Sequence, residues 1–248
     1  MIQYLKTMED FYFQLKKDII VVFLLKNINN VGGNNMKVIL VNGSPHKSGN
    51  TNEALEVVSN ELKACGIDIE IFWIGPKPVG GCIACLQCRE KGKCVFEDTV
   101  NEFVEKAKDA DGFIFGTPVH FAAMGGNIAS FMDRAFYSAS LSGRSNYFMF
   151  KPAASIITAR RAGTTATYDQ INKYFGICQM PIISTRYWNM VHGGYGDPKL
   201  INQDVEGIQM AKMLARNMVY YLKCIEAGKE KGVNAPKQEE TIYTNFIR

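Results

Sequence analysis

An apolar run at residues 37–42, Lys-Val-Ile-Leu-Val-Asn, most constrains how this chain folds. Such a run is typical of a strand buried on both faces of a sheet, because a strand with one wet face alternates apolar and polar residues. A glycine-containing loop and a segment of helical periodicity at 51–64 follow directly. A doubly buried strand that leads into a helix indicates a parallel α/β sheet. With 248 residues, 47% of them hydrophobic, the chain can bury such a core as a single domain.

The alternation of strand and helix continues toward the C-terminus. Further strands are predicted at 67–73, 112–116, 153–158 and 181–184, and further helices at 99–110, 126–136, 166–175 and from about residue 204. In the second strand Ile67, Ile69 and Ile71 alternate with Asp68, Glu70 and Phe72, a period of two that favours a place at the sheet edge. We therefore predict an α/β fold with a doubly wound, five-stranded parallel sheet in the order 2-1-3-4-5.

Both ends of the chain differ from this pattern. Residues 1–35 are rich in Ile, Lys, Asn, Phe and Tyr, and end in Gly-Gly-Asn-Asn before Met36. The glycine codons can spell a ribosome-binding sequence at a suitable distance from the Met36 codon, so we interpret 1–35 as a translated leader. The alternative is a genuine N-terminal helix at 11–25 that docks on the domain. The domain is predicted to span 36–227, and 228–248 to form a polar C-terminal tail.

Composition limits where the protein works and what it binds. The net charge is +4, but the basic residues are scattered, which disfavours nucleic-acid binding. The longest strongly apolar run, 19–25, is far shorter than the ~20 residues that a membrane-spanning helix needs. No small-residue cleavage site follows it, and seven cysteines without an export signal fit a reducing compartment. We expect a cytoplasmic protein that binds neither nucleic acid nor membranes.

Four of the seven cysteines lie close together in a long predicted loop, 75–96. Cys82, Cys85, Cys88 and Cys94 have the spacing C-x2-C-x2-C-x5-C, which favours ligation of an iron–sulfur cluster. A zinc ribbon usually separates two C-x2-C pairs, and a disulfide framework belongs to short secreted chains. Zinc and a loop of ordinary reduced thiols are the alternatives.

The loop after the first strand carries many groups that bind anions. Its residues 43–52 read Gly-Ser-Pro-His-Lys-Ser-Gly-Asn-Thr-Asn, where a doubly wound sheet binds its ligand at a helix N-terminus. The hydroxyls of Ser44, Ser48 and Thr51, the Asn50 amide and backbone N–H groups can together surround one phosphate. The loop is neither G-x-G-x-x-G nor a P-loop. The alternative is that Asn50 or Thr51 only caps the helix.

These motifs resemble the flavodoxin-like NAD(P)H-dependent FMN reductases, and within them the iron–sulfur flavoproteins. The resemblance covers about 36–227 and rests on three segments: Gly43-Ser44-Pro45 with 48–51, the cysteine motif after Gly81, and residues 116–121 with Met124-Gly125 and Asp133-Arg134. It implies a flavodoxin-like fold, an FMN phosphate in the first loop, residues 118–121 against the flavin ring, and 160–164 at its pyrimidine side.

The resemblance also implies the site residues. The cofactor-binding residues are Ser44, His46, Lys47, Ser48, Gly49, Asn50, Thr51, Asn52, Pro118, Val119, His120, Phe121, Arg160, Arg161, Gly163 and Thr164. The ligands of a [4Fe–4S] cluster are Cys82, Cys85, Cys88 and Cys94. No catalytic side chain is expected, because hydride transfer from a nicotinamide to flavin N5 needs no protein acid.

Some of these residues admit two roles. His120 stands where similar proteins more often have an aromatic residue, and we interpret it as packing on the ring. For Arg160 and Arg161, one interpretation is that one of them stabilises an anionic reduced flavin or the phosphate of a pyridine nucleotide. The other is that both are solvated surface charges. Residues 187–189 and His192 either roof the pocket or are structural.

The sequence thus predicts an FMN-dependent oxidoreductase with a [4Fe–4S] cluster and NAD(P)H as a candidate donor. Its partners are a small-molecule or redox-protein electron donor and acceptor. The resemblance implies a homodimer or homotetramer, and the apolar segment 147–150 is a candidate subunit contact. The alternatives are a clusterless NAD(P)H-dependent reductase of quinones, azo dyes or nitro compounds, and a non-enzymatic electron carrier of the flavodoxin type.

Overall fold

The computed structural model describes residues 36–244 and 246, so the predicted leader or helix within 1–35 lies outside the described residues. Within this part the strands are β1 (Lys37–Asn42), β2 (Asp68–Trp73), β3 (Gly112–His120), β4 (Ala123–Met124), β5 (Ala153–Ala159) and β6 (Met190–His192). The α-helices are α2 (Asn50–Ala64), α3 (Cys88–Lys91), α4 (Thr99–Ala107), α5 (Gly126–Leu141), α6 (Thr164–Ile177) and α7 (Val205–Glu230). Two short 3-10 helices are η1 (Ser145–Tyr147) and η2 (Pro198–Gln203).

The strands form one sheet in the order β2-β1-β3-β5-β6, and every neighbouring pair along it is parallel. The strand β4 pairs antiparallel with the end of β3 and lies off this path. Counted without that two-residue strand, the order is the predicted 2-1-3-4-5, and β2 lies at the edge as its alternating pattern indicated. The predicted fold class is confirmed.

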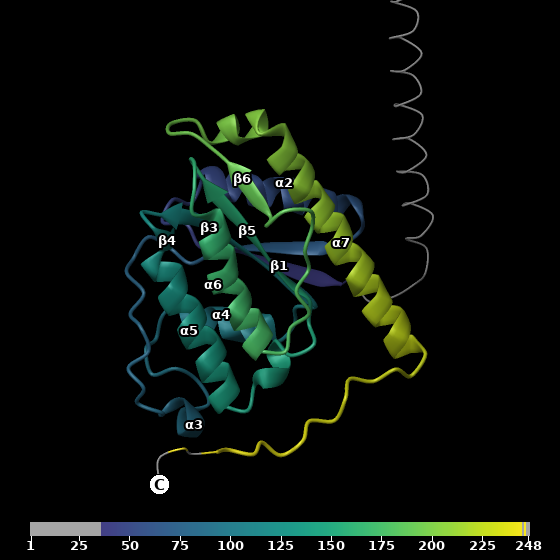
Figure 1. Cartoon of the computed structure of the whole chain (residues 1–248). Coiled ribbons are helices and arrows are strands. Elements are labelled where there is room, and N and C mark those ends of the chain that lie inside the picture. Colours follow the sequence, from purple (N-terminus) through teal and green to yellow (C-terminus); the bar gives the residue numbers. More distant parts are fainter. Residues whose placement is uncertain (1–35, 245, 247–248) are drawn as a thin grey trace, which may run out of the picture.

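Helices cover both faces of the sheet (Figure 1). Along β1, Val38 and Leu40 point to the face covered by α2 and α7, whereas Ile39 and Val41 point to the face covered by α4, α5 and α6. All four side chains have no exposed surface, as expected of a strand with two apolar faces. Phe103 of α4 lies within a cluster of aromatic rings on the second face, with centroids 5.1 to 6.0 Å from its neighbours.

The prediction of the fifth strand needs correction. The segment predicted as that strand, 181–184, makes only an isolated bridge, between Ile182 and Ala153. The strand that completes the sheet is β6, which pairs with β5, and residues with positive φ angles, Tyr187 and Asn189, lie between the two segments. Within the candidate subunit contact at 147–150, Phe148 is buried in the core of its own chain and the other three residues are half-buried.

Other boundaries shift by a few residues. The helix α4 ends three residues before its predicted end, and α5 continues to Leu141. The last helix continues through Glu230, beyond the predicted domain end at 227. The polar residues after it form no regular structure, and Gln238 accepts a hydrogen bond from Gln179 after α6. In the part of the chain that the structure describes, no helix is long and apolar enough to cross a membrane.

Candidate active site

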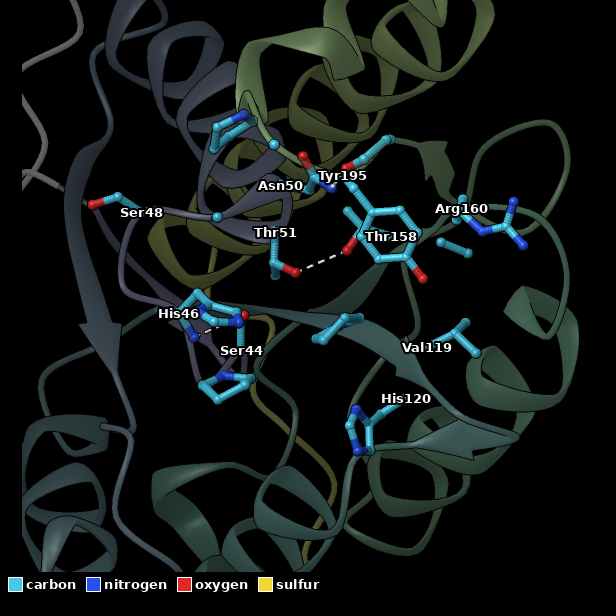
Figure 2. Close-up of a pocket in the computed structure, with 18 of the residues that line it drawn as sticks. Ser44, His46, Ser48, Asn50, Thr51, Val119, His120, Thr158, Arg160 and Tyr195 are labelled. Carbon is cyan, nitrogen blue, oxygen red and sulfur yellow. Dashed lines mark hydrogen bonds between the residues drawn. The ribbon is translucent and has the colours of Figure 1, made fainter.

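A pocket of about 930 Å³ lies at the carboxyl ends of β1, β3 and β5 (Figure 2). Loops that follow these strands, together with the start of α2 and the loop after β6, form its walls. The lining residues are Ser44, Pro45, His46, Ser48, Gly49, Asn50, Thr51, Pro118, Val119, His120, Phe121, Thr158, Ala159, Arg160, Gly193, Gly194, Tyr195, Gly196 and Pro198. Ligands of doubly wound sheets bind at this edge.

Hydrogen bonds fix the first loop in shape. The buried Asn42 accepts the N–H of Ser44 on Oδ1 at 3.0 Å, and its Nδ2 donates to the Lys47 carbonyl at 3.2 Å. The indole N–H of Trp73 donates to the Ser44 carbonyl at 2.9 Å, so the edge strand β2 also holds the loop. The Ser44 hydroxyl accepts the N–H of His46 at 3.1 Å. All four bonds are made within the protein, so the protein itself holds the loop in this shape.

The start of α2 shows that Asn50 and Thr51 have other roles than capping. The N-cap residue is Gly49, and no side chain makes the capping hydrogen bond. Asn50 Nδ2 instead donates to the Gly194 carbonyl at 2.9 Å, which ties the helix to the loop after β6. The hydroxyls of Thr51 and Thr158 lie 2.8 Å apart across the pocket floor (Figure 2). The first N–H groups of a helix lack partners within it, so this end can bind an anion.

The opposite wall is the end of β3. Pro118, Val119, His120 and Phe121 all line the pocket, and His120 and Val119 lie beside the cavity in Figure 2. Phe121 has a φ of 58° and a fully exposed side chain at the rim. A bulky residue in the left-handed region is uncommon, and here it makes the tight turn into β4.

Five predicted binding residues lie outside the lining and support it instead. The ammonium of Lys47 lies over the Trp73 ring, and the Asn52 amide accepts a hydrogen bond from Asn42. The Arg161 carbonyl contacts the ring of His192 at 3.1 Å. Gly163 begins α6 with a φ of 95°, and the Thr164 hydroxyl donates to the Met190 sulfur. All five residues thus contact groups next to the pocket and not the cavity itself.

The sequence reasoning missed the segment 193–198, which closes the pocket from the side of β6. A glycine-rich run after a strand is a known signal for such a loop, and Gly-Gly-Tyr-Gly at 193–196 carries it. With the fifth strand predicted at 181–184, this glycine run does not directly follow a predicted strand, so the signal is not recognised. Tyr187 and Trp188, considered as a roof, are exposed and do not line the pocket. Thr158 was also missed.

The charge of the pocket suits an anionic ligand. Among the described residues that line it, none is acidic. The guanidinium of Arg160 lies 5.9 Å from the centre of the Tyr195 ring, an arrangement in which the ring faces a cation. Both side chains are exposed to the pocket mouth (Figure 2).

The four clustered cysteines line a second, small cavity of about 20 Å³. Cys82 and Cys85 are exposed, Cys94 is half-buried and Cys88 is buried, where burial raises the pKa of its thiol. Ala84 and Leu86 have φ angles of 52° and 58°, so the chain winds tightly between the thiols and turns them to one cavity. The other lining residues are Ile83, Leu86, Val95, Phe96, Arg134, Tyr137 and Ser138.

No three His, Cys, Asp or Glu side chains among the described residues come close enough together to hold a single metal ion. The four thiols surround a cavity whose wall is otherwise mainly apolar and aromatic, apart from the guanidinium of Arg134 and the hydroxyls of Tyr137 and Ser138.

The chain is similar to known proteins in sequence and in fold. The profile of the family "NADPH-dependent FMN reductase" matches residues 36–194. An iron–sulfur flavoprotein of Methanocaldococcus jannaschii is 31% identical over 201 residues, which cover 77% of this chain and 100% of the relative. One of Methanosarcina thermophila is 26% identical, with 79% and 100% covered. Among solved structures, RosB with a bound riboflavin-phosphate derivative has a TM-score of 0.60 at 14% identity, with 86% and 94% covered.

The parallel sheet, its strand order and the pocket at its carboxyl edge define a flavodoxin-like α/β protein. The chain belongs to the NADPH-dependent FMN reductase family, in the branch whose named members are iron–sulfur flavoproteins. It is a flavin-dependent oxidoreductase with FMN as its cofactor, as the sequence motifs implied. As a redox enzyme it exchanges electrons with a donor and an acceptor.

Proposed function

We propose that the pocket holds FMN with its phosphate at the start of α2, and that the four cysteines hold a [4Fe–4S] cluster that exchanges electrons with it. NAD(P)H or a redox protein would be the donor. The observation that carries the proposal is the presence of two separate built sites, a preorganised anion loop and a cavity lined by four thiols.

The phosphate assignment follows from the donors gathered at one end of the pocket. Ser44, Ser48 and Thr51 offer hydroxyls, and the first turn of α2 offers N–H groups. A dianionic phosphate at this end gains from the helix dipole as well as from charge-assisted hydrogen bonds. Pocket walls without an acidic residue add no repulsion.

The remaining pocket suits a flat ring. Residues 118–121 form one side, and Tyr195 with Arg160 the other. Bound FMN supplies hydride and single-electron chemistry at this place. The chain's own residues orient the ring, and Arg160 places a positive charge where a reduced, anionic ring would need one. Lys47, Asn52, Arg161, Gly163 and Thr164 would act by holding these walls.

The donor set of the second cavity fits a cluster. Cys82, Cys85, Cys88 and Cys94 supply the four thiolates that a [4Fe–4S] group takes, and such a group separates its ligands farther than a single ion does. The relatives in this branch bear the name iron–sulfur flavoprotein. With two exposed thiols, the site is also open to a redox partner.

The test is anaerobic purification with flavin, iron and sulfide assays on the wild-type protein and two variants. Cys85→Ser removes one of four ligands, and we expect loss of iron and of the broad blue absorption while FMN stays bound. Cys224→Ser is the matched control, because Cys224 is exposed on α7 and far along the chain from the loop. This variant should change neither the FMN content nor the iron content.

Two outcomes would contradict the proposal. FAD instead of FMN in the released cofactor, or no flavin after reconstitution, would refute the flavin site. Wild-type protein that holds FMN but no iron after anaerobic reconstitution would refute the cluster, and a clusterless reductase would become the better interpretation.

A further inference from the structure

Arg134 of α5 is the largest fully buried side chain among the described residues, with 1% of its surface exposed. A charge in that position is costly unless it is paired and its hydrogen-bond donors are used. The flavin pocket makes no use of Arg134, since this residue lies on the wall of the cysteine cavity.

The guanidinium donates hydrogen bonds to one of the cysteines. Its Nε and one terminal nitrogen lie 3.4 and 3.2 Å from the Cys94 sulfur. The two terminal nitrogens also bind Asp98 at 2.6 and 3.0 Å, in the forked geometry that arginine makes with a carboxylate. An arginine guanidinium is not deprotonated in proteins, so this side chain brings a positive charge to the cavity wall.

Further bonds join both ends of the cysteine loop to the same side chain. The Gly80 carbonyl, before Cys82, accepts at 3.3 Å, and the Phe96 carbonyl, after Cys94, accepts at 3.4 Å. The Phe96 ring lies 4.8 Å from the guanidinium carbon. A rigid helix thus holds the entry and the exit of the loop through one planar group.

We propose that Arg134 is a positioning residue of the cysteine site: it closes the loop for ligation and directs two N–H groups at the Cys94 sulfur, which favours the more reduced state of the group held there. The inference rests on the proposed cluster. Reduction by one electron from a donor adds one negative charge to the site and breaks no bond. Hydrogen bonds to ligand sulfur stabilise that added charge and raise the reduction potential.

The carboxylate of Asp98 offers a second variant, whose reduction potential should shift in the other direction. Asp98 largely cancels the charge of Arg134, so in the wild-type protein the hydrogen bonds, more than the net charge, act on Cys94. Asp98→Asn keeps the N-cap of α4, because Asn caps as well as Asp, and leaves the guanidinium uncompensated. That variant should shift the potential in the opposite direction to loss of Arg134.

The experiment compares wild-type protein, Arg134→Gln, Arg134→Lys and Asp98→Asn after anaerobic reconstitution, with Arg216→Gln as control. Arg216 forms an ion pair with Glu61 across α7 and α2, on the other face of the sheet. The readouts are FMN content, iron per chain, and the midpoint potential of the iron-dependent signal in a redox titration followed by electron paramagnetic resonance.

We expect Arg134→Gln to retain iron about 10-fold less tightly. The fraction that keeps iron should reduce at a more negative potential, with FMN content unchanged. Arg134→Lys, which keeps the charge but not the fork, should fall between, and Asp98→Asn should reduce at a more positive potential. The control should match the wild-type protein.

If wild-type protein contains iron and all variants have the same midpoint potential as wild type, the inference about Arg134 is overturned. The proposed cluster is then still supported. Lower stability without any shift in potential would assign Arg134 a structural role only. If Arg134→Gln does not fold, the opposite shifts expected for Arg134→Lys and Asp98→Asn still decide. Wild-type protein without iron would remove both proposals together.

Discussion

At the floor of the pocket, the hydroxyl oxygens of Thr51 and Thr158 lie 2.8 Å apart, and both side chains are almost fully buried. A hydroxyl both donates and accepts, so Thr158 can donate to Thr51 and leave the Thr51 proton free for a phosphate oxygen. Thr158 would then orient Thr51 without touching the ligand. The two threonines come from α2 and β5 and are 107 residues apart, so no local sequence pattern predicts their contact.

Thr51→Ala is expected to weaken FMN binding by about 1–2 kcal/mol, since a hydrogen bond to a charged phosphate is lost. Thr158→Val should weaken it less, because it removes only the orienting partner. Flavin-free stability should change less than FMN affinity, since Thr51 does not cap α2 and only its bond to Thr158 is lost in the apo-protein. Titration of apo-protein with FMN, followed by flavin fluorescence, measures the first effect. Unchanged affinity together with reduced stability of the apo-protein would argue for a purely structural threonine pair.

At the scale of elements, the end of β1 packs against β3 too closely for a side chain. A Cβ atom at Gly43 would lie 2.8 Å from Ile128 and 2.9 Å from the Gly116 carbonyl, while the Gly43 N–H donates to that carbonyl at 2.8 Å. The close approach lets the loop 43–49 begin directly at the sheet edge. Glycine is needed here for space.

Gly43→Ala should therefore lower the free energy of unfolding by about 1–3 kcal/mol through overpacking. Gly176→Ala is the matched control: Gly176 lies in α6, and a Cβ there meets nothing within 4 Å. That variant should raise stability by about 0.5–1 kcal/mol, because alanine favours a helix over glycine. Urea unfolding measures both. If Gly176→Ala lowered the free energy of unfolding as much as Gly43→Ala does, the packing argument would be contradicted.

The sequence predicted elements well where the pattern was strong. The run in β1 and the alternation in β2 set their places in the sheet, and the fold follows from them. The prediction was wrong at β6. The segment Met190–His192 is only three residues long and includes a histidine, so it carries no strand signal, whereas residues 181–184 have the composition of a strand. Pairing with β5 selects Met190–His192, and that choice depends on tertiary contacts that no short window contains.

At the scale of the whole molecule, α5 connects the two sites. Its first residue follows Gly125, which approaches His120 of the pocket wall, and Arg134 lies eight residues along, about 12 Å up the helix axis. Local motifs located the loop 43–52 and the four cysteines in the sequence. The separation of the sites, the loop 193–198 and the bonds of Arg134 were not predictable, because each depends on how distant segments meet.

Removal of residues 1–35 should leave thermal stability and FMN content unchanged. The family profile matches from residue 36 onward, and the Methanocaldococcus jannaschii relative is matched over its whole length by 77% of this chain. Thermal unfolding and flavin release of the shortened and the full chain provide the comparison. A lower midpoint for the shortened chain would support the alternative of a helix that docks on the domain.

The exposure of the cysteine loop has a practical consequence for anyone who stores this protein. Cys82 and Cys85 stand at the surface, whereas Cys65 is buried and burial raises the pKa of its thiol. Accessible thiols oxidise to sulfenic acid and then to disulfide or sulfinic acid, and buried ones are largely inert. Peptide mass spectrometry should therefore measure how far a sample has been oxidised by air. The oxygen gained at Cys82 and Cys85 is the signal, and Cys65 is an internal reference.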